Sequence, residues 1–73
     1  SYKYYASKGL IIMAKNFLAL DDVFQATYIL ENVIQNFTEF PEITAEAQVE
    51  LDRIKTEAAK TNASIEVDSE NEN

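Results

Sequence analysis

A single glycine and a single proline interrupt this chain of 73 residues. Because tight turns and strand ends depend on these two residue types, so few of them leave little room for a β-sheet. Most of the remaining positions are filled by residues that favour helices, such as alanine, leucine, glutamate and lysine. The sequence therefore predicts an all-α fold, and a chain of this length forms one domain at most.

Three consecutive segments carry apolar residues at helical spacing, which predicts three helices. We expect them at about residues 2–19, 22–37 and 41–60, so that residues 1–60 form the helical domain. Asp21 and Asp22 both offer N-cap oxygens for the second helix, and Gln25 is in the position of a capping-box partner of Asp22. Pro41 suits the first turn of the third helix. Only two or three residues connect the first two helices, which predicts an antiparallel hairpin.

The packing face of each helix is expected along its apolar stripe. The first helix carries Leu10, Met13, Ala14 and Phe17. The second carries a stripe wide enough to be covered on two sides, made of Val23, Ala26, Ile29, Leu30, Val33, Ile34 and Phe37. The third carries a narrower stripe, made of Ile43, Ala47, Leu51, Ile54 and Ala58. A helix that is apolar on one side only is typical of the end of a stack.

Charge is distributed unevenly along the chain. Residues 1–20 contain three lysines and no acid, whereas residues 21–73 contain three basic residues and all thirteen acids. The net charge of −7 disfavours binding to nucleic acids or to anionic membranes. Membrane insertion is also not expected, because the longest strongly apolar stretch covers only residues 10–14. Residues 61–73 hold four acids and no base, which predicts a disordered acidic tail.

The residue types that most compact active sites need are missing. The chain has no cysteine and no histidine, which removes thiolate nucleophiles, soft metal ligands and imidazole acid–base groups. Neighbouring carboxylates occur at Asp21 and Asp22 and at Glu46 and Glu50, but the aspartates are explained as helix caps and the glutamates as exposed helix positions. We therefore predict no catalytic, cofactor or metal site, and we expect that the chain is not an enzyme.

Six positions share the spacing of a known repeat. They are Leu10, Met13, Ala14, Phe17, Ala26 and Leu30. The small alanines allow close helix contact and the larger residues fill the space around it. The segment 7–40 resembles a tetratricopeptide repeat, although Thr38 stands where proline is usual. A second copy of the repeat aligned at Leu51 would place the charged residues Asp52 and Lys55 at positions that are normally buried, where neither fits.

This resemblance implies a function as well as a fold. The segment is similar to the last repeat of a larger bacterial protein, closed by a capping helix, which implies a non-catalytic protein–protein interaction scaffold. In the family, partner peptides lie along the first helices of the repeats. On this chain that face is expected to contain Lys8, Ile11, Ile12 and Lys15, which would suit a peptide with acidic groups. Alternatively, the isoleucines pack on a preceding repeat and the lysines are solvated.

Two further surfaces lead to different expectations. Tyr2, Tyr4 and Tyr5 crowd the start of the first helix and, together with Ile11, Ile12 and Leu18, predict self-association once a neighbouring repeat is missing. A structural homo-oligomerisation module is therefore the alternative function. The acidic tail either folds back on the first helix as an electrostatic mask or acts as a solubilising terminus.

Overall fold

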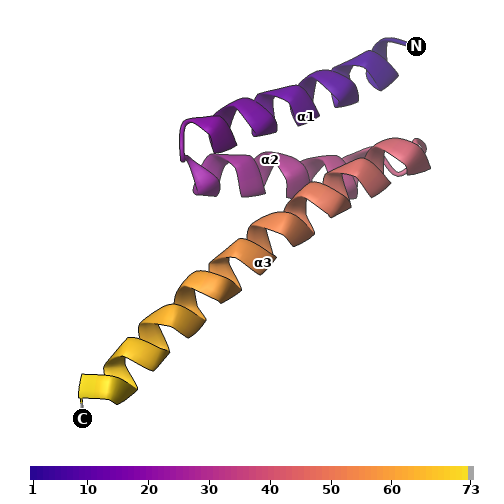
Figure 1. Cartoon of the computed structure of the whole chain (residues 1–73). Coiled ribbons are helices and arrows are strands. Elements are labelled where there is room, and N and C mark those ends of the chain that lie inside the picture. The colour runs from indigo at the N-terminus through magenta and orange to yellow at the C-terminus, as the bar shows by residue number, and fades with distance from the viewer. Residues whose placement is uncertain (73) are drawn as a thin grey trace.

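The structure is a computed structural model that describes the backbone of residues 1–72 and the side chains of residues 1–62. Over this range it consists of three helices and has no strand. They are α1 (Tyr2–Ala19), α2 (Val23–Asn36) and α3 (Pro41–Glu72). The first two form an antiparallel hairpin, and α3 packs against α2 before it extends beyond the hairpin (Figure 1). The predicted all-α class with a helical hairpin is confirmed.

The connection between α1 and α2 is a tight turn around Asp21, which has a positive φ of 62°. The Asp21 N–H donates to the Leu18 carbonyl at 2.9 Å, and the Asp22 N–H donates to the Phe17 carbonyl at 2.8 Å. These two bonds form a Schellman motif that ends α1. Asp22 then caps α2, since its Oδ1 accepts a hydrogen bond from the Gln25 N–H at 3.1 Å. The predicted N-cap is confirmed, whereas Asp21 serves the end of the preceding helix.

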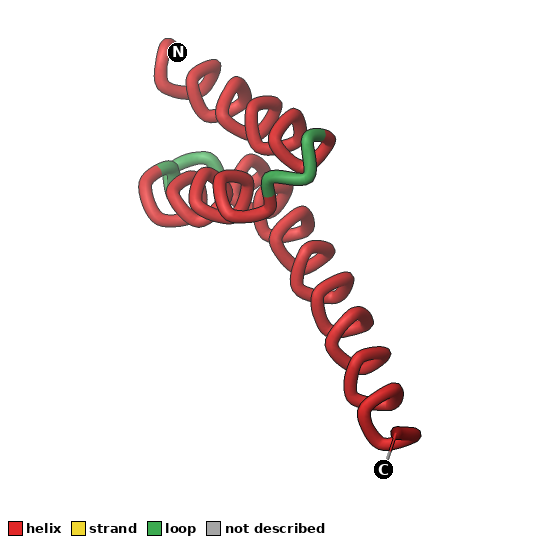
Figure 2. The backbone as a smooth tube through the Cα atoms, turned by 90° about the vertical axis from the view of Figure 1, so that its left-hand side faces the viewer, coloured by secondary structure: helices red, strands yellow, loops and turns green. Residues whose placement is uncertain are grey.

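The connection between α2 and α3 lies at the other end of α2 (Figure 2). The Phe40 N–H donates to the Phe37 carbonyl at 3.0 Å, and the Phe40 carbonyl in turn accepts from Ile43 and Thr44 in the first turn of α3. Pro41 is the first residue of α3, as predicted, because its fixed φ and missing N–H suit that position. The chain therefore reverses direction twice within short connections, which places α2 between α1 and the first part of α3.

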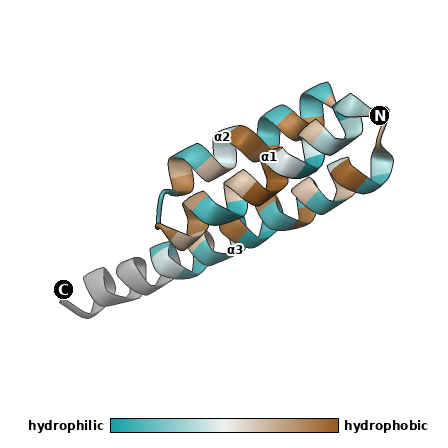
Figure 3. Ribbon diagram, turned by 90° about the horizontal axis from the view of Figure 1, so that it is seen from above, coloured by the Kyte–Doolittle hydropathy of each residue, from teal (hydrophilic) through white to brown (hydrophobic). Residues whose placement is uncertain are grey.

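The core lies between the three helices, with α2 in the middle, since α2 packs against both neighbours and α1 and α3 touch only slightly. All three helices contribute apolar residues to this contact, and Figure 3 shows hydrophobic positions along each of them. The buried apolar residues are Ile11, Ala14, Ala26, Ile29, Leu30, Val33, Ile43, Ala47 and Leu51. The prediction that the broad stripe of α2 is covered on two sides is therefore confirmed.

The packing face of α1 differs from the predicted one. Met13, predicted to be in the stripe, is 47% exposed, whereas Ile11, predicted to be on the free side, is only 2% exposed. Because α1 carries apolar residues on nearly all sides, more than one stripe satisfies the helical period. The face that packs places the small residues Ser7 and Ala14 in the contact, and both are fully buried. Small side chains let the two helices approach closely, which decides the rotation of α1.

Helix α3 continues to Glu72, twelve residues beyond its predicted end at residue 60. Its apolar stripe is buried at Ile43, Ala47 and Leu51, half-buried at Ile54 and exposed at Ala58. The stripe is thus longer than the hairpin that covers it. The acidic tail predicted at residues 61–73 lies, apart from its first two residues, outside the described side chains.

Candidate protein-interaction face of α1

One exposed side of α1 carries alternating apolar and cationic residues. Tyr5, Lys8, Ile12 and Lys15 follow one another at intervals of three, four and three residues, a spacing that places them on one helical face. Tyr5 is 71% exposed and Ile12 is 60% exposed. Both lysines are exposed as well. We call these four residues the cationic face of α1.

The two lysines of the cationic face are positioned by neighbours inside the chain. The Lys8 Nζ lies 5.3 Å from the centroid of the Tyr4 ring, within the range of a cation–π interaction. The Lys15 Nζ lies 3.6 Å from Glu46 Oε2 on α3. Because an ammonium group has three N–H donors and both side chains remain exposed to solvent, each lysine can bind a further acceptor.

The third lysine of α1 lies on another side of the helix. The Lys3 Nζ donates to Glu39 Oε2 at 2.6 Å and also lies 5.5 Å from the centroid of the Phe37 ring. The hydrogen bond from Lys3 lowers the pKa of the Glu39 carboxyl below its usual value. Lys3 therefore links the start of α1 to the α2–α3 connection and is not part of the cationic face.

Three of the four predicted peptide-binding residues lie on this face. Lys8, Ile12 and Lys15 come together as expected, but Ile11 belongs to the core and cannot contact a partner. Tyr5 takes the fourth position, although its place in the sequence suggested only the aromatic cluster at the start of the helix. The 5–8–12–15 spacing is the signal that would have identified it.

The six positions of the repeat signature are buried to different degrees. Ala14, Ala26 and Leu30 are completely buried, and Leu10 and Phe17 are half-buried against the core. Met13 is the exception, since it lies on the exposed side of α1. The close contact of small and large residues around the two alanines is therefore present without the contribution expected of Met13.

The predicted self-association surface is only partly exposed. Tyr2 and Tyr5 are exposed, whereas the Tyr4 ring packs edge-on against Phe40 with the centroids 5.5 Å apart. Leu18 is half-buried, and Ile11 is buried. Other large apolar side chains are exposed that the sequence did not assign to this surface: Met13, Leu20, Val23, Phe24, Tyr28 and Val49.

The buried polar side-chain groups of the described residues are satisfied by local structure. The Ser7 hydroxyl is buried and donates to the Tyr4 carbonyl at 2.6 Å. Over the described part of the chain, no buried side-chain polar atom lacks a hydrogen-bond partner, and no cluster of three or more acidic side chains could hold a metal ion. None of the helices, as far as they are described, combines the length and the apolar character needed to cross a bilayer.

No protein-family model, curated protein or solved structure matches this chain. The resemblance to a tetratricopeptide repeat therefore stays a prediction. The cationic face of α1 is one candidate interaction surface, since two exposed lysines alternate there with exposed apolar side chains.

Proposed function

We propose that this chain is a non-catalytic protein–protein interaction scaffold and forms the terminal, tetratricopeptide-like unit of a longer bacterial repeat array. The exposed cationic face of α1 is the observation that supports this proposal most strongly. A helix whose outer side carries exposed apolar residues next to cations offers both contact area and charge selection to a partner. The third helix, α3, would then close the array on the side away from the preceding repeats.

The spacing of the cationic face defines the peptide that fits it. Lys8 and Lys15 are seven residues apart, which corresponds to about 10 Å along the helix axis. A peptide in the extended polyproline II conformation covers this distance in about three residues, and its three-residue period places the first and the last of these side chains on the same side. The partner is therefore an extended segment with two carboxylates three positions apart, and its intervening apolar side chain packs on Ile12.

Binding of a short synthetic peptide tests this proposal. The probe contains two glutamates three positions apart with leucine and alanine between them, and its control has glutamine in place of both glutamates. We expect the double variant Lys8→Gln, Lys15→Gln to bind the glutamate peptide about tenfold more weakly in fluorescence anisotropy, because two charge-assisted contacts are lost.

A matched variant controls for the change in net charge. Lys55→Gln with Lys60→Gln removes the same charge from α3, where neither lysine belongs to the cationic face. This control is expected to bind like the unmodified chain. Equal weakening by both double variants, or tight binding of the glutamine peptide, would contradict the proposed contact.

A homo-oligomerisation module is the second candidate function, and the number of exposed apolar side chains favours it. Tyr2, Tyr5, Phe24 and Tyr28 all expose large aromatic surfaces. Exposed aromatic groups of this kind often lie at protein interfaces. Sedimentation equilibrium distinguishes the two functions: a mass that rises with concentration, and falls again in Phe24→Ser or Tyr28→Ser variants, supports the oligomer, whereas a monomer at every concentration rejects it.

A further inference from the structure

The apolar stripe of α3 continues past the helices that cover it. Ile43, Ala47 and Leu51 are buried, but Ile54 is half-buried and Ala58 is exposed. The change occurs where α3 diverges from the hairpin (Figure 1). Because the stripe keeps its spacing across this point, the exposed part of α3 has the form of a packing surface without a partner.

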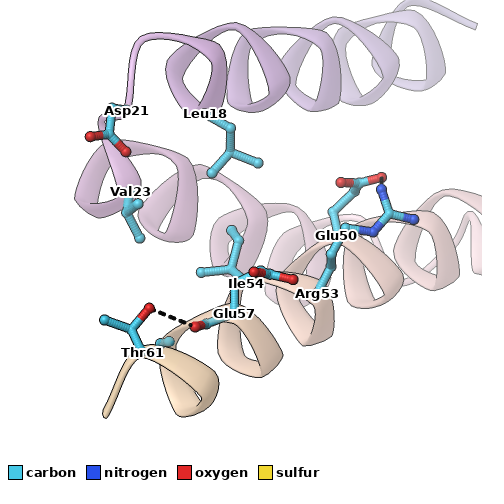
Figure 4. Close-up of a pocket in the computed structure, with 9 residues that line it drawn as sticks. Leu18, Asp21, Val23, Glu50, Arg53, Ile54, Glu57 and Thr61 are labelled. Atoms are coloured by element: carbon cyan, nitrogen blue, oxygen red, sulfur yellow. Dashed lines mark hydrogen bonds and ion pairs between the residues drawn. The ribbon is translucent and has the colours of Figure 1, made fainter. Parts of the chain in front are cut away.

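A groove lies at this point between α3 and the α1–α2 turn. Its volume is about 370 Å³. In Figure 4, Leu18 and Val23 extend from the hairpin toward Ile54 on α3. Along α3 the lining runs from Glu50 to Thr61, which corresponds to about three helical turns. A groove of this length is better suited to the side of an elongated segment than to a compact small molecule.

Acidic residues predominate at the edges of the groove. Asp21 lies on the hairpin side, and Glu50 and Glu57 lie on α3. Arg53 is the only basic residue of the lining among the described residues, and its Nη1 lies 3.4 Å from Glu50 Oε1. Lys60, next to the lining, lies 3.5 Å from Glu57 Oε1. Even with this lysine counted, the edges carry a net negative charge around an apolar floor.

We propose that this groove binds a basic amphipathic helix of another protein. Apolar side chains of the partner would contact Leu18, Val23 and Ile54, while lysines or arginines on its flanks would face Asp21 and Glu57. Such a helix would continue the packing of α3 beyond the end of the hairpin. The site is separate from the cationic face of α1 and selects the opposite charge, so it does not depend on the function proposed above.

The charge of the chain favours another protein over a second copy as the occupant. Each copy carries a net charge of −7, so two copies repel each other, whereas a basic partner is attracted.

A designed peptide pair tests the groove. The probe is a helical peptide of about 18 residues, or five turns, with leucines along one side and lysines on both flanks. The comparison peptide has the same leucines and carries glutamates in place of the lysines. We expect the lysine peptide to bind in fluorescence anisotropy and its affinity to fall several-fold between about 50 and 300 mM salt. The glutamate peptide is not expected to bind.

Two kinds of variant show whether the lysine peptide binds in the groove. Ala58→Arg places a long cationic side chain in the groove from an exposed helix position and is expected to weaken binding at least about tenfold. Asp21→Asn with Glu57→Gln removes the charges at the edges and is expected to weaken it about threefold to tenfold. The matched control, Glu31→Gln with Glu42→Gln, removes the same charge outside the groove lining and is expected to have no effect.

Each outcome of these measurements either supports or overturns the proposal that the groove binds a basic helix. Weakening by the groove variants alone supports the proposal, provided that circular dichroism shows the same helix content in all variants. Equal weakening by the control means that the peptide responds only to net charge, and it overturns the proposal. A chain that dimerises alone, and that Ala58→Arg converts to a monomer, would show that a second copy occupies the groove and would also overturn it.

Discussion

Helices α1 and α2 pack against each other, but they bury their residues under different constraints. In α2 the buried residues Ala26, Ile29, Leu30 and Val33 all lie within the predicted stripe, and the exposed opposite side is polar apart from Phe24 and Tyr28. In α1 apolar residues face both the core and the solvent, so that Ile11 is buried while Ile12 and Met13 are exposed. Apolar spacing identifies the packing face of a helix only where the other side is polar.

The residues at the centre of the core and the residues of the cationic face also lie on different helices. The buried side of α2 holds the centre of the core, and its residues contact both neighbouring helices. The outer side of α1 contributes little to that core, yet it carries the lysines and the exposed apolar residues of the cationic face. Substitutions on these two surfaces should therefore have separable effects on folding and on binding.

The largest expected loss of stability comes from a substitution at the centre of α2. Leu30 is completely buried, so Leu30→Ala leaves a cavity and should lower the free energy of unfolding by about 2–5 kcal/mol. Because small domains have only about 5–15 kcal/mol in total, the urea midpoint measured by circular dichroism should fall strongly or the transition should disappear. Leu30→Met nearly conserves the volume and should cost less than about 1.5 kcal/mol. Equal midpoints for the two variants would contradict the assigned core.

The next effect tests the rotation of α1 directly. Ile11→Ala should lower the free energy of unfolding by about 2–4 kcal/mol, because Ile11 is buried in the core. Met13→Ala should lower it by less than about 1 kcal/mol, because the Met13 side chain is largely in solvent. Urea titrations of both variants give the comparison. A larger loss for Met13→Ala would show that the packing face is the one expected from the sequence.

Much of the fold could be predicted from the sequence because local signals agreed with it. The three helices, the N-cap at Asp22 and the start of α3 at Pro41 each depend on nearby residues alone. The buried face of α1 could not be predicted, because the choice between Ile11 and Met13 depends on how closely α2 approaches Ser7 and Ala14.

Of the two candidate sites, one could be predicted from the sequence and the other could not. Lys8, Ile12 and Lys15 were predicted together, since their spacing on one helix is sufficient to place them on one side. The groove beside Ile54 was not predicted, because it forms only where α3 diverges from the hairpin. The position of the groove depends on the lengths and relative directions of the packed helices, which cannot be predicted from a local sequence pattern.

The two aspartates of the α1–α2 turn should respond in opposite directions. Asp21 has a left-handed backbone conformation, which glycine adopts without steric cost, so Asp21→Gly should stabilise the chain by about 0.5–1 kcal/mol. Asp22 caps α2, so Asp22→Ala should destabilise it by about 1 kcal/mol. Thermal melting followed by circular dichroism measures both. Shifts of the melting temperature in the same direction would contradict the assigned roles.

A substitution on the outer side of α1 should change the stability of the chain by a smaller amount. Gly9 is exposed, and an added Cβ would have no neighbour within 4 Å. Gly9→Ala should therefore stabilise α1 by about 0.5–1 kcal/mol, because alanine is the better helix former. Ala6→Gly, also at an exposed position of α1, is the reverse control and should destabilise by a similar amount. A loss of stability in Gly9→Ala would mean that another group packs closely against this side.

The smallest effect concerns the ion pair that links α1 to the α2–α3 connection. The hydrogen bond from Lys3 lowers the pKa of Glu39 in the folded chain. A carboxyl with a lowered folded pKa contributes stability above its unfolded pKa and loses it as the pH falls through the folded pKa. Because the pair is exposed, the resulting change in the melting temperature between neutral and acidic pH should be slight.

Carbon-detected NMR titration of the Glu39 carboxyl can measure this effect even where melting cannot. Lys3→Gln removes the ammonium group, and it should raise the pKa of Glu39 toward its ordinary value. Lys55→Gln removes the same charge from α3 and should leave the Glu39 titration unchanged. An identical Glu39 titration in the Lys3→Gln variant and in the unmodified chain would show that the Lys3–Glu39 hydrogen bond is not formed in solution.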